Sequence, residues 1–410
     1  MSLPPRLKRS ITLPFLIFYG LGTMVGGGFY ALLGVVLQEA GSATPFALLL
    51  TGLLALLSAC SFAELSSRYP VSAGEAHYVR EGFGHTGFST VVGWLVVLTG
   101  LVSAATLAVA CIAFLEDRFT LHSGLGIFLL VLAMGMVAGW GIGQSVGVVT
   151  AITFIEVGAL LYILGINVGA FAEFPTRTTE IVPSWGAGSG SWLGVFSGAF
   201  LAFYAFIGFE DMVNMAEEVK NVRRSLPIAI LVSIALTTVL YVAVALAAVL
   251  SGSTERLAES STPIAELASG QGWMSTTGIW LVSLLAGLNG ALVQIIMSSR
   301  VAYGMAERNQ APRWFAVIHP RTRTPLQATL AMTIIILVLA LFFPLTTLAR
   351  TTSAIILLVF AAVNLALWRI KKSDPNPACE GPRFPRWLSL AGFVASLLVV
   401  AFQVWLTLTA

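Results

Sequence analysis

Long runs of apolar, uncharged residues recur along the whole chain, and they restrict its fold more than any other feature. A helix needs about 20 such residues to cross roughly 30 Å of hydrocarbon. Only 10% of the 410 residues are charged and 57% are hydrophobic, whereas soluble globular domains carry about 25% charged residues. This balance excludes a soluble, disordered, collagen-like or disulfide-dense chain. It indicates a polytopic membrane protein.

The apolar runs predict eleven membrane-spanning helices and no soluble domain. Strands of a β-barrel would be about ten residues long and alternate in polarity, which these runs do not. No small-residue cleavage site follows the first run, so it is predicted to be a retained helix and not a signal peptide. The predicted spans are 11–37, 43–67, 87–115, 123–140, 145–172, 193–217, 226–251, 275–304, 326–344, 346–369 and 387–408.

The basic residues predict the orientation of these helices. With the N-terminus in the cytoplasm, 18 of the 22 Lys and Arg residues fall on the cytoplasmic side, as the positive-inside rule requires. The other four are Arg118, Arg177, Arg256 and Arg350. We therefore expect a multi-pass protein of the inner (plasma) membrane, with the C-terminus outside if the helices number eleven.

Two of the segments contain glycine near the middle of an apolar run. In the first, Gly26–Gly28 each cost a helix about 1 kcal/mol relative to Ala, which favours a break. Close helix packing is the alternative interpretation, although three adjacent glycines cannot all lie on one face. In the sixth segment, Ile207–Gly208 precede the acids Glu210 and Asp211, which predicts a break followed by a polar half-helix.

These two segments are five apart, so they would occupy matching places in two halves of opposite topology. Such a pair of interrupted helices indicates a transporter binding site. The N-terminus of a half-helix offers free N–H groups to a carboxylate, and a half-helix C-terminus offers carbonyls to an ammonium group or a cation. A zwitterion would fit both ends.

Four stretches, in matching order, resemble the amino acid–polyamine–organocation (APC) superfamily of transporters. They are Gly22–Gly34 (GTMVGGGFYALLG), Phe62–Gly84, Phe203–Pro227 and Gly290–Leu330. The resemblance implies an all-α leucine-transporter-type fold with an inverted five-plus-five repeat. The first repeat would cover 11–172, the second 193–369, and an additional helix 387–408.

The resemblance further implies a permease or exchanger that moves an α-amino acid by alternating access, without catalysis or a cofactor. The substrate carboxylate would meet the amides of Gly26, Gly27 and Gly28. Its α-amino group would meet carbonyls near Thr23, Met24, Tyr204, Ala205 and Ile207. Tyr204 matches an aromatic gate of several relatives, with ordinary aromatic packing as the alternative.

The fifth segment departs from the resemblance. Some proton-coupled relatives have a Lys eleven residues after the Ser of a G-x-x-x-S start; Gly141 and Ser145 match that start, and Glu156 occupies the Lys position. Glu156 is a candidate for carrying a proton or pairing with a cation, with a neutral hydrogen-bonded Glu as the alternative. Ser298 and Ser299 are candidates for a Na⁺ site, with helix-interface hydrogen bonds as the alternative. We expect H⁺ ahead of Na⁺ as the coupling ion.

The remaining polar residues predict no chemistry. Glu64 and Arg68, four apart on one helix end, predict either a local ion pair or a cytoplasmic gate contact. The sequence has no metal-ligand spacing or phosphate-binding motif, so we expect no metal. The net charge of +3 is too small to indicate a nucleic-acid partner, and we expect none. An amine or polyamine carrier is the alternative function, ahead of a membrane-embedded enzyme or a sensor without transport.

Overall fold

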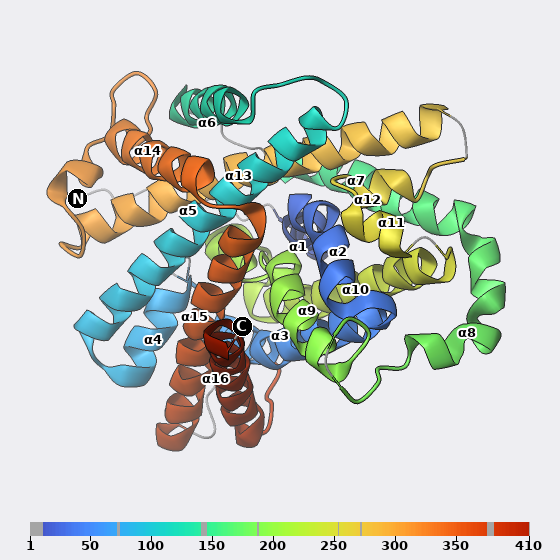
Figure 1. Ribbon diagram of the computed structural model, residues 1–410. Helices are drawn as coiled ribbons and strands as arrows, with labels where there is room; N and C mark the ends of the chain where they lie inside the picture. Colours follow the sequence, from blue (N-terminus) through green and yellow to red (C-terminus); the bar gives the residue numbers. More distant parts are fainter. Residues whose placement is uncertain are drawn as a thin grey trace.

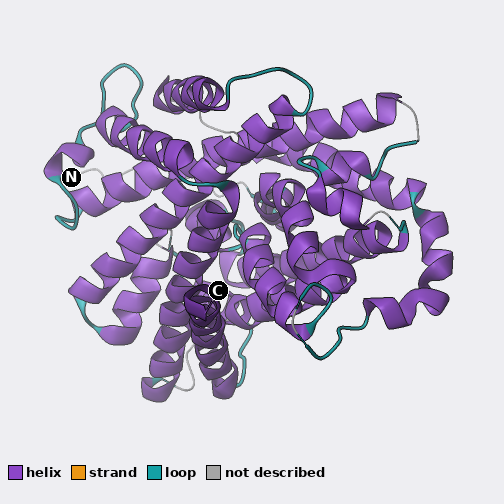
Figure 2. Cartoon of the chain, in the orientation of Figure 1, coloured by secondary structure: helices purple, strands orange, loops and turns teal. Residues whose placement is uncertain are grey.

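The computed structural model describes residues 11–71, 74–140, 146–186, 188–252, 254–270, 273–374 and 381–409. Within these ranges the chain is helical, with two isolated β-bridges and no strand (Figure 2). Eight described helices are long and apolar enough to cross a membrane, or nine if a bent pair counts as one span. The prediction of an all-α polytopic membrane protein is therefore confirmed. Gly141 and Ser145 lie outside the described residues.

Each predicted segment corresponds to one helix or to one interrupted helix. The number of crossings stays a prediction, since the helices over Leu13–Val25 and Leu326–Phe342 fall short of a full span. In chain order the elements are α1 (Leu13–Val25) with α2 (Gly27–Ala40), α3 (Thr44–Arg68), α5 (Thr86–Glu116), α6 (Ser123–Trp140), α7 (Val146–Ile166), α9 (Trp192–Ala202) with the 3₁₀ turns η3 (Phe203–Phe206) and η4 (Glu210–Glu218), α10 (Val222–Leu250), α13 (Trp273–Glu307), α14 (Leu326–Phe342), α15 (Leu345–Ser373) and α16 (Arg386–Thr409).

Short elements connect these helices. They are η1 (Gly41–Ala43), α4 (Gly74–Phe83), η2 (Val168–Glu173), α8 (Phe174–Ile181), α11 (Thr254–Glu259), α12 (Pro263–Glu266) and η5 (Arg313–Ala316). The fifth predicted segment ends earlier than expected, because the chain turns by 55° between α7 and the η2–α8 stretch. There the side-chain amide of Asn167 donates to the backbone carbonyl of Ile163 at 2.9 Å. It competes for this carbonyl with the backbone N–H that would continue the helix.

The interrupted helices lie inside the bundle and the apolar outer helices lie at its edge. α1 packs on α10, α2 packs on α9 and α13, and α3 packs on α10 (Figure 1). α6 and α14 lie together at the upper edge of Figure 1, and α15 and α16 lie side by side at the lower edge. Large apolar side chains point outward from these edges, including Met136, Leu330 and Leu398, each more than half exposed. An apolar surface of this kind is suited to the hydrocarbon core of a bilayer.

Small residues let neighbouring helices approach closely. A Cβ placed on Gly52 of α3 would collide with Thr238 of α10, and one on Gly135 of α6 would collide with Thr333 of α14. Membrane helices associate through such small residues because lipid tails remove the hydrophobic drive between helices. These contacts fix the bundle around its interrupted helices.

Candidate functional site

The two interrupted helices touch at their breaks. Gly26, with φ −52° and ψ −166°, separates α1 from α2. In the second interrupted helix, η3 gives way to the extended Ile207 (φ −67°, ψ 136°) and then to Gly208. The hydroxyl of Thr23 donates to the carbonyl of Gly208 at 3.0 Å. The backbone N–H of Ile11 also donates to the carbonyl of Glu218 at 3.0 Å, so α1 and η4 are joined at their far ends too.

Glycine is required at position 208 by both conformation and space. Its φ is +129°, a region that side-chain-bearing residues rarely adopt. A Cβ there would lie 2.6 Å from the carbonyl oxygen of Thr23. The N–H of Gly208 donates to the carboxylate of Glu210 at 2.9 Å, so the side chain after the break satisfies a backbone group at it.

A tyrosine on a third helix connects the two breaks. The hydroxyl of Tyr241 on α10 lies 2.7 Å from the carbonyl oxygen of Met24 and 3.1 Å from that of Ala205. Its buried ring stacks on Phe29 with 3.8 Å between centroids. The sequence analysis missed this residue, although Tyr241 is the one aromatic residue within 226–251.

Replacing Tyr241 with phenylalanine (Y241F) is expected to weaken substrate binding and leave the fold intact. The ring stays stacked, but two buried carbonyls lose their shared donor, at a cost of about 1–3 kcal/mol. We expect the KM for substrate uptake into proteoliposomes to rise by about tenfold, because the backbone of both breaks loses its common anchor. Thermal unfolding measures the stability change separately.

Thr51 offers a matched control for this variant. Its buried hydroxyl also reaches two carbonyls on two helices, those of Ala47 at 2.7 Å and Ala199 at 2.9 Å, and neither lies at a break. T51V should lower stability by a similar amount and leave the KM unchanged. Equal KM values for Y241F and wild type would show that the Tyr241 hydroxyl only supports the fold.

The breaks line one small pocket together with α5 and α13. Seven of the eight predicted substrate-contact residues line it, and Ala205 is the exception. Its volume is about 50 Å³, which is room for a few water molecules only. The sequence analysis missed the contributions of α5 and α13. The lining residues are Tyr19, Gly22, Thr23, Met24, Gly26–Gly28, Ser103, Leu107, Tyr204, Ile207, Asp211, Asn289, Gly290, Val293 and Gln294.

Tyr204 lines one side of this pocket. Its side chain is buried, and its hydroxyl donates to the carbonyl of Ser103 on α5 at 3.0 Å. A Cβ on Gly28 would lie 3.0 Å from the Tyr204 ring, so the ring lies directly against the start of α2. Tyr204 therefore joins η3 to both α2 and α5.

The start of α2 carries no side-chain cap. Gly26 at the N-cap position makes no side-chain hydrogen bond, and the first N–H groups of a helix have no partner within it. Gly27 lies so close to Gly287 of α13 that a Cβ would be 2.5 Å from its Cα. These glycines leave the positive end of the α2 dipole open to the pocket.

The coupling candidates lie outside the pocket lining. Glu156 on α7 is fully buried, and neither of its carboxyl oxygens has a hydrogen-bond partner among the described residues. Its backbone carbonyl accepts from the Tyr30 hydroxyl at 2.7 Å. Ser298 donates to the carbonyl of Gln294 at 2.8 Å, and Ser299 donates to that of Ile296 at 2.8 Å.

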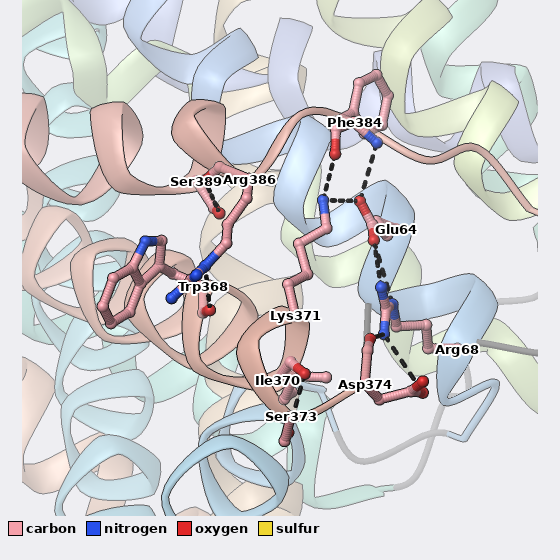
Figure 3. A network of polar contacts seen from close by, with 10 residues as sticks. All are labelled: Glu64, Arg68, Trp368, Ile370, Lys371, Ser373, Asp374, Phe384, Arg386 and Ser389. Carbon is pink, nitrogen blue, oxygen red and sulfur yellow. Dashed lines mark hydrogen bonds and ion pairs between the residues drawn. The ribbon is translucent and has the colours of Figure 1, made fainter. Parts of the chain in front are cut away.

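Ion pairs join helices at both ends of α15. At one end Arg350 pairs with Glu39 of α2, whose carboxylate also accepts from Ser197 at 2.7 Å. At the other end Lys371 pairs with Glu64 of α3 at 2.5 Å (Figure 3). The local pair predicted from the sequence is confirmed, because Arg68 lies 2.7 Å from Glu64.

Glu64 also fixes the segment that leads into α16. Its carboxylate accepts from the backbone N–H of Phe384 at 3.0 Å, while Lys371 donates to the carbonyl of the same residue at 2.5 Å (Figure 3). The Glu64 side chain is fully buried, and those of Arg68 and Lys371 nearly so. Within the described ranges, no group of three or more His, Cys, Asp or Glu residues could hold a metal ion.

Comparison with known proteins gives transporters and permeases. The chain is 28% identical over 398 residues to the vacuolar cationic amino acid transporter 4 of Arabidopsis thaliana, covering 91% of this chain and 65% of that protein. It is 26% identical over 439 residues to the branched-chain amino acid permease BcaP of Bacillus subtilis, covering 98% and 91%. It spans a little under two thirds of two Arabidopsis relatives, 65% and 63%.

The family comparison covers almost the whole chain. The profile of the amino acid permease family matches residues 11–409, which include every described element from α1 to α16. This match agrees with the resemblance seen in the four sequence stretches. The chain belongs to the amino acid permease family.

Proposed function

We propose that this protein moves an α-amino acid across the plasma membrane by alternating access, as a permease or an exchanger. The observation that carries the proposal is the meeting of two interrupted helices at one pocket, with the uncapped start of α2 beside it. The amides of Gly26–Gly28 would bind the substrate carboxylate, and carbonyls near Thr23, Met24, Tyr204 and Ile207 would bind its α-amino group. The carbonyls of Met24 and Ala205 lie within reach of the Tyr241 hydroxyl and would also take part in binding the α-amino group.

The pocket would have to open before an amino acid could enter. A volume of about 50 Å³ holds water and excludes an amino acid. Tyr204, which lies against Gly28 and donates to Ser103, is the group whose displacement would open one side. We assign it the role of gate, within two inverted repeats over 11–172 and 193–369 and an additional helix over 387–408.

A flux screen tests the proposal. The purified protein would be reconstituted in liposomes, and protease accessibility would show on which side of the bilayer the N-terminus lies. Uptake and counterflow of the twenty L-amino acids and of putrescine would be measured with and without H⁺ and Na⁺ gradients. We expect flux of at least one α-amino acid, and neither flux nor binding for any compound would contradict the proposal.

Replacing Glu156 with glutamine (E156Q) is expected to remove the dependence of uptake on external pH. The buried carboxyl has no partner in the described part of the chain, so it can take up a proton without breaking an ion pair seen there, whereas an amide cannot take up a proton. Wild-type uptake should rise when the external pH falls from about 8 to 6, and E156Q uptake should stay flat. A pH profile unchanged by E156Q would leave Glu156 as a neutral packing residue.

Sodium coupling is the lesser alternative. The hydroxyls of Ser298 and Ser299 already donate to carbonyls of their own helix, and Ser298 lies against Gly100 of α5. A Na⁺ gradient that drives uptake in wild type, and fails in the double variant S298A/S299A, would place the ion there. We therefore propose H⁺ first.

Asp211 supports a second candidate function, the transport of a cationic amino acid or an amine. It is the one charged side chain in the described pocket lining, and it is 3% exposed. A buried carboxylate at a binding pocket favours a cationic partner. The neighbouring acid Glu210 has a different partner, since its carboxylate accepts from the backbone N–H of Gly208 at 2.9 Å.

Replacing Asp211 with asparagine (D211N) is expected to separate these two functions. If the side chain recognises a cation, L-arginine and putrescine uptake should fall by about tenfold or more, since the charge pairing is lost. L-Leucine uptake should fall less than threefold. D117N, at the exposed end of α5, is the matched control. Equal losses for arginine and leucine would contradict cation recognition by Asp211.

A further inference from the structure

A long apolar groove lies on the outer face of the bundle, away from the pocket. It runs between α3, α9 and α16 and has a volume of about 850 Å³. Leu53 on α3, Phe196 on α9 and Leu398 on α16 form its walls and are 52%, 42% and 63% exposed. α3 and α16 both belong to candidate membrane spans, so the groove faces hydrocarbon.

A buried ion pair fixes one end of the groove. Phe384 lines the groove at this end, and its backbone N–H and carbonyl bind Glu64 and Lys371 (Figure 3). The N–H of Phe384 donates to Glu64 at 3.0 Å and its carbonyl accepts from Lys371 at 2.5 Å. Charged groups that are almost fully buried therefore fix the position of this end of the groove.

The same end carries two arginines. The guanidinium of Arg386 lies over the Trp368 ring at 4.1 Å, and its Nε donates to the Trp368 carbonyl at 3.2 Å (Figure 3). Arg383 precedes Phe384 directly and is exposed. The described residues that line the groove itself include none that is charged. Two basic residues thus flank Phe384, which lines the groove, on the predicted cytoplasmic side.

We propose that this groove binds an anionic phospholipid, with an acyl chain along α16 and the phosphate at Arg386 and Arg383. The lining on α16 runs from Leu388 to Phe402, which is about 21 Å at 1.5 Å per residue and long enough for the acyl chain of one ~15 Å leaflet. Basic pockets between membrane helices on the cytoplasmic side bind lipid headgroups in this way.

The shape of the walls favours a lipid over a second copy of the chain. Leu and Phe make up most of the lining, and they form a groove and not a flat face. Helix pairs in membranes pack through stripes of small residues, as Gly52 and Gly135 do inside this bundle. A flexible acyl chain fits a groove of large side chains, whereas a second protein chain would need a helix surface complementary to it.

Native mass spectrometry of the detergent-solubilised protein tests the proposal. The probes are phosphatidylglycerol and phosphatidylcholine with identical palmitoyl-oleoyl chains. We expect wild type to retain phosphatidylglycerol at least fivefold better, since one basic group near the membrane surface contributes about that factor. The preference should fall as ionic strength rises, a measurement that needs no variant.

Two pairs of variants separate the chain site from the headgroup site. A395W puts a bulky ring in the groove and should reduce retention of both lipids, while V394W adds the same ring on the exposed face next to it and should not. R383Q/R386Q should remove the preference for phosphatidylglycerol. R313Q/R321Q, which removes two exposed arginines elsewhere, should keep it.

Three results would overturn the proposal. One is equal retention of the two lipids by wild type at low ionic strength. Another is equal retention of phosphatidylglycerol by A395W and V394W. The third is a wild-type dimer that A395W converts to monomer, which would make the groove an interface between two copies. Each readout is independent of the transported substrate.

Discussion

Replacing Gly208 with alanine (G208A) is expected to abolish transport and to destabilise the protein by about 2–4 kcal/mol. Two costs add at this residue. The φ of +129° is a strained conformation for alanine, and the new methyl group would lie 2.6 Å from the backbone oxygen of Thr23. Neither can be relieved by a side-chain rotation, because the obstacle is backbone. The two breaks would have to separate, and the pocket that they line would change shape.

Gly304 on α13 provides the control. A Cβ there would meet no described atom within 4 Å and its φ is ordinary, so G304A should be neutral or stabilising by up to about 1 kcal/mol. Thermal unfolding in detergent and uptake into proteoliposomes measure the two effects. Wild-type uptake by G208A would show that the contact between the breaks is dispensable for transport.

Replacing Glu64 with alanine (E64A) is expected to cost about 3–5 kcal/mol of stability. The variant removes one buried carboxylate that accepts from Arg68, from Lys371 and from the N–H of Phe384. Both cations would remain almost fully buried, and among the described residues Asp374, 3.8 Å from Arg68, would be the acid left to balance them. An uncompensated buried charge costs more than the ion pair itself contributed.

Glu180 offers a matched surface comparison. It pairs with Arg177 at 2.8 Å, but its side chain is 55% exposed, so E180A should cost less than about 1 kcal/mol. E64Q should fall between the two, because the amide keeps a hydrogen-bond acceptor and loses the charge. The midpoint of thermal unfolding orders the three variants. An E64A midpoint equal to that of E180A would contradict the assigned role of the Glu64 cluster.

The breaks could be predicted from sequence because their causes are local. Gly26–Gly28 and Gly208 weaken a helix wherever they occur, and Glu210 follows at the spacing that reaches the backbone of Gly208. The helices could also be predicted, because an apolar run is a local feature of the sequence. The 55° turn after α7 was missed. Asn167 lies at this turn, and its side chain donates to the carbonyl of Leu267, 100 residues along the chain, a contact that no local pattern predicts.

The rest of the pocket depends on packing between distant segments. Ser103 and Asn289 lie in ordinary apolar runs, and no periodicity distinguishes them from interface residues. Tyr241 lies 217 residues from Met24 and 36 from Ala205, so only the fold brings its hydroxyl to both carbonyls. The buried pair of Glu64 and Lys371, 307 residues apart, is hidden for the same reason.

The Tyr241 hydroxyl has one hydrogen and two carbonyls within reach. It can therefore donate to Met24 or to Ala205, and rotation about one C–O bond transfers the donation from one break to the other. Any motion that draws one carbonyl away leaves the hydrogen bonded to the remaining one. The number of bonds stays constant while the partner changes, so the two interrupted helices can part without exposing an unsatisfied donor. The Tyr241 hydroxyl can thus keep one hydrogen bond with either break as its acceptor.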